Sequence, residues 1–122
     1  MTGAADIDIA RVYAHPARDG RALILVDRLW PRGIRKEELG ADDWIKEVAP
    51  SNELRKWFGH DPALYDEFRR RYRAQLDANP QAVGRCLEWC RKGPVRLLYG
   101  AKDEEHNQAV VLRDYLIEKS AV

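Results

Sequence analysis

The sequence predicts an α/β fold, in which a small, mainly parallel, three-stranded sheet is covered by helices. The strands are expected in short, largely apolar runs at residues 7–13, 22–26 and 95–99. The run at 22–26 is apolar throughout, which is typical of a strand buried on both faces. Apolar residues at helical spacing fill most of the chain between the second and third runs, and strands separated by helices favour a parallel sheet.

Five helices are expected from the spacing of apolar residues and from residues that commonly begin helices. In chain order they occupy residues 42–48, 51–59, 61–76, 79–93 and 103–116. Four of them open at an expected cap, and proline follows the cap in two cases. The expected caps are Ser51, Asp61, Asn79 and Asp103.

These elements form one domain over residues 7–119, after a flexible N-terminal tail over residues 1–6. The expected layering is that of Rossmann-like and flavodoxin-like proteins. The connection between the first two strands is too short for a helical crossover, so the sequence leaves their relative direction open.

Charge and hydropathy narrow the class of protein. The 21 Lys and Arg residues nearly balance 20 Asp and Glu, whereas a surface that binds nucleic acid throughout usually carries a larger basic excess. No apolar run approaches the roughly 20 residues that cross a bilayer. The first residues lack the basic start and apolar core of a secretory signal. We therefore expect a cytoplasmic protein without membrane contact.

The two cysteines, Cys86 and Cys90, are expected on one face of a helix as small buried hydrophobes. Helical geometry aims such a pair poorly for a disulfide. A metal or redox pair is the alternative interpretation, but the chain offers no second pair of Cys or His with zinc-like spacing. No metal site is predicted.

The candidate site follows from the segment 26–33, where the second strand ends in two arginines and a tryptophan. Ligands of open α/β sheets bind beyond the carboxyl ends of the strands. Residues that follow the three strands should therefore converge at one edge, joined by the beginning of the helix at 51–59 and by the beginning of the last helix. The predicted ligand-binding residues are Tyr13, Arg28, Trp30, Arg32, Ser51, Arg55, Tyr99, Lys102 and Asn107.

These residue types suit an anionic small molecule, phosphorylated or nucleotide-like. The cationic side chains Arg28, Arg32, Arg55 and Lys102 would hold phosphate or carboxylate. An aromatic ring of Trp30 or Tyr13 would stack on a base. In the structural alternative, Arg28 pairs with Asp27 and the Trp30–Pro31 segment closes the sheet edge.

The sequence assigns no reaction, catalytic residue or cofactor. Candidate acid–base groups are Asp27, Asp103, His60 and Tyr99, without a recognisable catalytic motif around them. A nucleic-acid-associated or regulatory protein with no catalytic activity is the main alternative, based on the arginines of residues 69–73. The same arginines would also suit a solvated helix face. A third interpretation is an interaction module that dimerises through Trp44 and Trp57, and the oligomeric state stays open.

Three segments, 26–33, 49–58 and 97–107, resemble the signature blocks of the YeaO-like family of bacterial proteins, a branch of domain of unknown function 488. The resemblance extends from about Arg11 to Leu116. It implies a small α/β fold and a cytoplasmic bacterial protein, and it implies no established reaction, cofactor or catalytic residue. A related branch opens its last helix with a Cys-His-Arg triplet where this chain has residues 106–108, His-Asn-Gln. That departure argues against carrying cysteine chemistry over.

Overall fold

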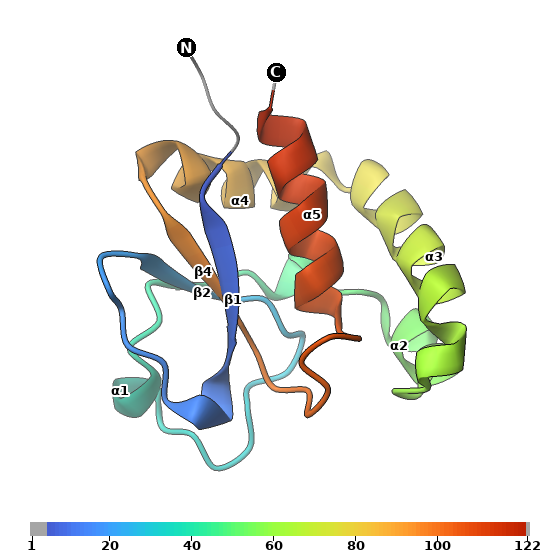
Figure 1. Cartoon of the computed structure of the whole chain (residues 1–122), viewed down its shortest axis with the longest axis horizontal. Helices are drawn as coiled ribbons and strands as arrows, with labels where there is room; N and C mark the ends of the chain where they lie inside the picture. The colour runs from blue at the N-terminus through green and yellow to red at the C-terminus, as the bar shows by residue number, and fades with distance from the viewer. Residues whose placement is uncertain (1–4, 122) are drawn as a thin grey trace.

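The computed structural model describes residues 5–121, and one sheet of four parallel strands lies at its centre (Figure 1). The strands are β1 (Ile7–Arg11), β2 (Ala22–Leu25), β3 (Asp43–Trp44) and β4 (Val95–Tyr99). Their spatial order is β1-β4-β2-β3, and each neighbouring pair is parallel. The predicted α/β class and parallel sheet are confirmed. The prediction of three strands is wrong, because β3 adds a fourth at the edge beside β2.

The additional strand lies in the segment 42–48, where the sequence predicted a helix. The backbone N–H groups of Asp42 and Ile45 donate to the carbonyls of Leu23 and Leu25, at 2.7 and 3.0 Å. These bonds continue the ladder of β2, and an edge strand of two residues satisfies backbone groups that a helix would have left unpaired. Only the end of the segment turns, as a short 3₁₀ helix.

Helices lie between the strands and after the last one. The α-helices are α1 (Lys36–Leu39), α2 (Asn52–Phe58), α3 (Tyr65–Asp77), α4 (Pro80–Lys92) and α5 (Gln108–Ser120). The 3₁₀ helices are η1 (Val12–Ala14), η2 (Lys46–Val48) and η3 (Pro62–Leu64). The first predicted strand ends earlier than expected, because residues 12–14 turn as η1.

The position of β4 answers the question of strand direction. β4 lies between β1 and β2, so that Val95 pairs with Ile7 on one side and with Ala22 on the other. All three strands run the same way. The connection between β1 and β2 runs back from the end of β1 to the start of β2 without an α-helix, and η1 is its one helical turn.

The two faces of the sheet are covered unequally (Figure 1). Helices α2, α3, α4 and α5 cover one face, where Ile24 and Leu97 pack against buried helix residues such as Phe68 and Leu112. The other face carries a smaller cluster formed by Val12, Leu23, Leu25, Leu39 and Leu98. Burial of apolar surface on both faces explains the continuous apolar pattern of β2.

Two of the predicted helix starts need correction. Asp61 accepts from the Ala63 N–H, but the chain first forms η3, and α3 begins at Tyr65. Asn79 precedes α4 as expected, although its side chain donates to the Glu47 carbonyl at 2.9 Å and does not cap the helix. Both positions still mark where the chain turns into a helical segment.

The expected cap of the last helix is also wrong. The Asp103 carboxylate accepts from the backbone N–H groups of Glu105 and His106, each at 2.9 Å, within the turn before the helix. The cap of α5 is Asn107, whose Oδ1 accepts from the Val110 N–H at 3.1 Å. An Asp and an Asn within five residues offer competing caps, and the later one begins the helix.

Residues 1–4 of the expected flexible tail lie outside the described residues. Asp6 is described, and its carbonyl accepts from the Val95 N–H at 2.9 Å. None of the helices between residues 5 and 121 is both long and apolar enough to span a bilayer.

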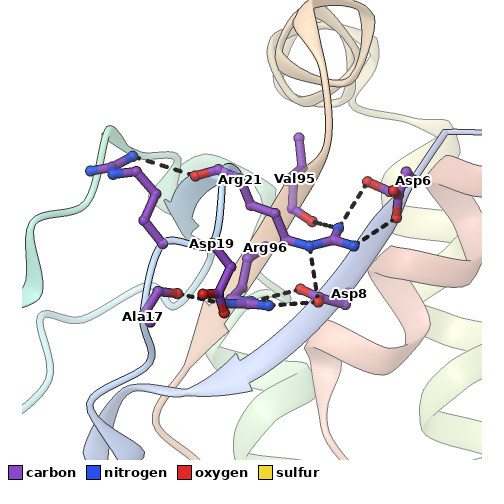
Figure 2. A network of polar contacts seen from close by, with 8 residues as sticks. Asp6, Asp8, Ala17, Asp19, Arg21, Val95 and Arg96 are labelled. Carbon is purple, nitrogen blue, oxygen red and sulfur yellow. Dashed lines mark hydrogen bonds and ion pairs between the residues drawn. The ribbon is translucent and has the colours of Figure 1, made fainter.

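A polar network joins the amino-terminal end of β4 to β1 and to the connection that follows η1 (Figure 2). Arg96 donates from Nε and Nη2 to the two oxygens of Asp8, both at 2.9 Å. Its Nη1 donates to the Ala17 carbonyl and to Asp19. Arg21 forms ion pairs with Asp6 at 3.0 Å and with Asp8 at 3.2 Å. The connection between β1 and β2 has no α-helix packed on the sheet, and these polar contacts hold it in position instead.

We expect Arg96→Ala to lower the free energy of unfolding by about 2 kcal/mol, because charge-assisted bonds to a partly buried carboxylate are lost. The Arg96 side chain is only 14% exposed. Urea denaturation of the variant would measure the loss. Arg70→Ala is the matched control, since that side chain is 76% exposed and its partner Glu67 keeps Arg71. An equal midpoint for the two variants would contradict the structural role of Arg96.

Candidate functional site

A cavity of about 280 Å³ lies at the carboxyl edge of the sheet. It is lined by the segments that follow β1, β2 and β4, by the region around α2, and by the beginning of α5. This is the edge where open parallel sheets bind their ligands. The position agrees with the location that the sequence predicted for a site.

Asp27 connects the elements around the cavity. Its Oδ2 accepts from the Gly100 N–H at 2.8 Å, and its Oδ1 accepts from the Gln108 side-chain amide. The ends of β2 and β4 and the first residue of α5 therefore meet at one carboxylate. A Cβ atom on Gly100 would lie 3.0 Å from Asp27 Oδ2, a tight contact that would press on the carboxylate.

Burial raises the pKa of Asp27 to about 6, against hydrogen bonds from Gly100 and Gln108 and the positive charge of Arg55, which lower it. The carboxyl group therefore gains or loses its proton near pH 6, close to physiological pH. A strongly shifted group that lines a cavity is a candidate functional residue.

Arg28 lines the cavity and also holds the segment before α2. Its Nε donates to the Pro50 carbonyl at 3.2 Å, and its Nη2 donates to the Ala49 carbonyl at 2.9 Å. No ion pair joins Arg28 to Asp27 within residues 5–121, so the internal pairing considered above is absent from the described chain. The guanidinium keeps one nitrogen, Nη1, without a protein acceptor among those residues.

Aromatic side chains form much of the wall. Trp30 Nε1 donates to the Ile34 carbonyl at 2.6 Å, and its ring meets Trp44 edge to face at a centroid distance of 5.4 Å. The Tyr13 hydroxyl donates to the Arg32 carbonyl at 2.8 Å. The Tyr13 bond ties the loop after β2 to η1, and the Trp30 bond lies within that loop. Both rings line the cavity.

The structure brings five of the predicted site residues to this cavity: Tyr13, Arg28, Trp30, Arg55 and Asn107. Arg55 is exposed and donates to Asn52 at 3.2 Å. Asn107 is fully engaged, because its oxygen caps α5 and its nitrogen donates to the Asp103 carbonyl at 2.8 Å. The Asn107 side chain therefore holds the turn in which α5 begins.

The other four predicted residues do not line the cavity. Arg32 and Lys102 are exposed, and Tyr99 is buried in the core. Ser51 lies beside a second cavity of about 110 Å³, on the other side of Arg28. Its hydroxyl accepts from the Leu54 N–H at 3.1 Å, which confirms the predicted cap, and from Gln75 at 2.9 Å.

Sequence reasoning placed Asp27 at the strand end and among the acid–base candidates, but not among the predicted site residues. It missed Gln108, which reaches the cavity as the first residue of α5 and carries no motif of its own. Phe58 and Phe68 were expected only as apolar helix faces. Their rings stack at 4.4 Å and line the cavity from α2 and α3.

No three His, Cys, Asp or Glu side chains gather into a metal-binding group anywhere in the described part of the chain. Both cysteines are free thiols on α4. Burial raises the pKa of Cys86 to about 12, so its thiol stays protonated at neutral pH.

The fold and the cavity define a small parallel α/β protein with a candidate binding site at the carboxyl edge of its sheet. A family model described as "Inactive DUF488-N3 subclade" matches residues 6–122. The chain belongs to this family, which confirms the resemblance found in the sequence. No solved structure matches the chain.

Relatives agree with the family. The chain is 44% identical over 111 residues to "Uncharacterized protein YeaO" of Escherichia coli (strain K12), which covers 91% of this chain and 96% of the relative. It is 47% identical over 70 residues to "Uncharacterized protein Rv3073c" of Mycobacterium tuberculosis (strain ATCC 25618 / H37Rv). That match covers 57% of this chain and 59% of the relative.

The pKa of Asp27 predicts a pH-dependent stability. Because the native pKa of about 6 exceeds the ordinary value of 3.8, the native state binds more protons between these values. The free energy of unfolding should fall as pH rises through this window and stay low above it. Asp27→Asn removes this effect, so its stability relative to wild type should increase by about 2–3 kcal/mol from pH 4 to pH 7.5.

Urea denaturation of both proteins at the two pH values measures this change. Asp66→Asn is the control, because Asp66 is exposed on α3. The same difference between Asp27→Asn and wild type at both pH values would show that Asp27 has an ordinary pKa.

Proposed function

We propose that this protein binds an anionic small molecule, phosphorylated or nucleotide-like, in the cavity at the carboxyl edge of its sheet. The observation that supports the proposal most directly is the open hydrogen-bonding capacity of two arginines in the cavity wall. Arg28 Nη1 has no acceptor within residues 5–121, and Arg55 uses only Nη2, toward Asn52. Guanidinium groups are well suited to phosphate and carboxylate.

The accessibility of the Arg28 nitrogen supports the same proposal. Every deeply buried side-chain nitrogen or oxygen of the described residues has a hydrogen-bond partner. Arg28 Nη1 has none, so it is accessible to solvent and not enclosed in the core. The two backbone carbonyls that hold Arg28 fix its orientation, and a fixed guanidinium loses less entropy when an anion binds.

The aromatic wall favours a ligand with a planar or ring-shaped part. Phe58, Phe68 and Trp30 line the same cavity as the two arginines. Its volume of about 280 Å³ lies near the lower end of small-molecule sites, about 300–1,000 Å³. A ligand no larger than a mononucleotide suits this volume better than a large dinucleotide.

The proposal includes binding and no reaction. At residues 106–108, where a related branch carries a thiol, this chain has His-Asn-Gln. His106 Nδ1 lies 2.9 Å from Asp103 Oδ2 and Asn107 caps α5, so both are engaged locally. The matched family model is itself described as inactive.

The arginine-rich part of α3 favours the small-molecule proposal over nucleic-acid binding. Arg70 and Arg71 both bind Glu67, and Arg73 binds Glu118 at 2.9 Å. The Arg71 guanidinium also lies 4.2 Å from the centre of the Trp57 ring. These cations are partly neutralised within the protein, and Arg71 covers one face of the Trp57 ring.

Titration calorimetry at low salt with ribose 5-phosphate and with adenosine 5′-monophosphate tests the proposal. We expect saturable binding with one site per chain. Arg55→Ala should weaken it by about 10-fold or more, because a charge-assisted bond contributes about 1.5–3 kcal/mol.

Arg69→Ala is the matched control, since Arg69 is exposed on α3 and does not line the cavity. It should leave the affinity unchanged. Absence of saturable binding by both probes, or equal affinities for wild type and Arg55→Ala, would refute the proposed function.

A further inference from the structure

The interior of the cavity offers hydrogen-bond acceptors. Each oxygen of Asp27 accepts one bond from the protein, from Gly100 or from Gln108, and an ionised carboxylate oxygen has room for a second. The Gln108 amide donates through Nε2, and its Oε1 receives no bond from residues 5–121. That oxygen is also accessible, because the deeply buried side-chain oxygens of the described residues all have partners.

The acceptors of Asp27 and Gln108 are adjacent, because the two side chains are hydrogen-bonded to each other. The free donors belong to Arg28 and to the exposed Arg55. The cavity therefore has two chemically different parts, one that accepts hydrogen bonds and one that donates them and carries positive charge. A ligand that complements both parts has a donor group at one end and an anion at the other.

Resting on the proposed function, we propose that the ligand is a nucleoside monophosphate whose base carries an exocyclic amino group. The two N–H bonds of one amino group match the two acceptors, an Asp27 oxygen and Gln108 Oε1. The phosphate stays at Arg55, where the wall is exposed. The base lies against the aromatic side chains of the wall.

The aromatic wall decides between this ligand and a simpler one. A small amino acid also combines an ammonium donor with a carboxylate, and it would satisfy Asp27 and Arg55. It would make no contact with the rings of Phe58 and Trp30 that line the cavity. A nucleobase covers such rings, and base–aromatic stacking contributes about 1–3 kcal/mol.

The experiment compares nucleotides that differ in the amino group, by titration calorimetry at pH 7.5. Adenosine and guanosine monophosphates are compared with inosine monophosphate, which lacks both exocyclic amino groups, and cytidine monophosphate is compared with uridine monophosphate. We expect at least one amino nucleotide to bind 10-fold or more tightly than its counterpart. In place of the amino group of adenosine or cytidine, inosine or uridine has a carbonyl oxygen, which would meet the Asp27 carboxylate as a second acceptor. In place of the amino group of guanosine, inosine has a hydrogen atom, which leaves both acceptors without a donor.

Asp27→Asn should reduce this preference to about 3-fold or less, because the amide replaces one acceptor by a donor. Gln108→Met is a second variant that keeps the length of the side chain and removes Oε1, and it should also weaken the preference. Asp66→Asn is the matched control and should leave it unchanged. Circular dichroism of each variant verifies folding before the titrations.

The outcomes separate the two proposals. Binding of ribose 5-phosphate with equal affinities within every nucleotide pair would overturn this inference and leave the proposed function standing. A preference that survives in both folded variants would also overturn it. If neither ribose 5-phosphate nor any nucleotide binds, the proposed function itself fails.

Discussion

The structure depends on the position of β4, which is hydrogen-bonded on both sides and holds β1 and β2 in one sheet. Its apolar residues face both clusters of the core, with Leu97 toward the helices and Leu98 toward the thinner layer. A polar cluster lies at each end of this strand. Arg96 lies near its amino-terminal end, and Gly100 follows its carboxyl end with the N–H that binds Asp27.

The two polar clusters differ in whether their arginine has a nitrogen without a hydrogen-bond acceptor. This difference distinguishes a structural cluster from a candidate binding site. All three nitrogen atoms of the Arg96 guanidinium have acceptors in the protein. Arg28 donates from two nitrogens to backbone carbonyls, and its third nitrogen has no acceptor within residues 5–121. A saturated group such as Arg96 can only stabilise the fold, whereas an accessible unsatisfied group can exchange water for a ligand.

The sequence was informative wherever a local pattern determines structure. The apolar runs predicted three strands, Ser51 predicted the start of α2, and the rule on strand ends predicted the edge where the cavity lies. It failed where tertiary contacts decide. Asp43 and Trp44 form β3 because β2 offers unpaired carbonyls, and nothing within residues 42–48 shows that.

The candidate site follows the same division. Tyr13, Arg28 and Trp30 reach the cavity because they directly follow strands whose ends coincide. Gln108 reaches it because Asn107, and not Asp103, begins α5, which sets where the first side chain of that helix points. Tyr99 ends in the core because the alternation along β4 directs its ring toward the helices. A change of one residue in a register or a cap moves a side chain into or out of a site.

The central place of β4 also determines when this chain can fold. Within the described residues β1 pairs with β4 alone, and β2 is separated from β1 by that same strand. Pairing therefore joins segments near opposite ends of the chain, which costs loop-closure entropy and slows folding. On the ribosome, β1 has no partner strand and β2 keeps the edge opposite β3 unpaired until residues 95–99 emerge. Helices α3 and α4 are synthesised earlier, but the sheet that they cover forms only after the last strand has been made.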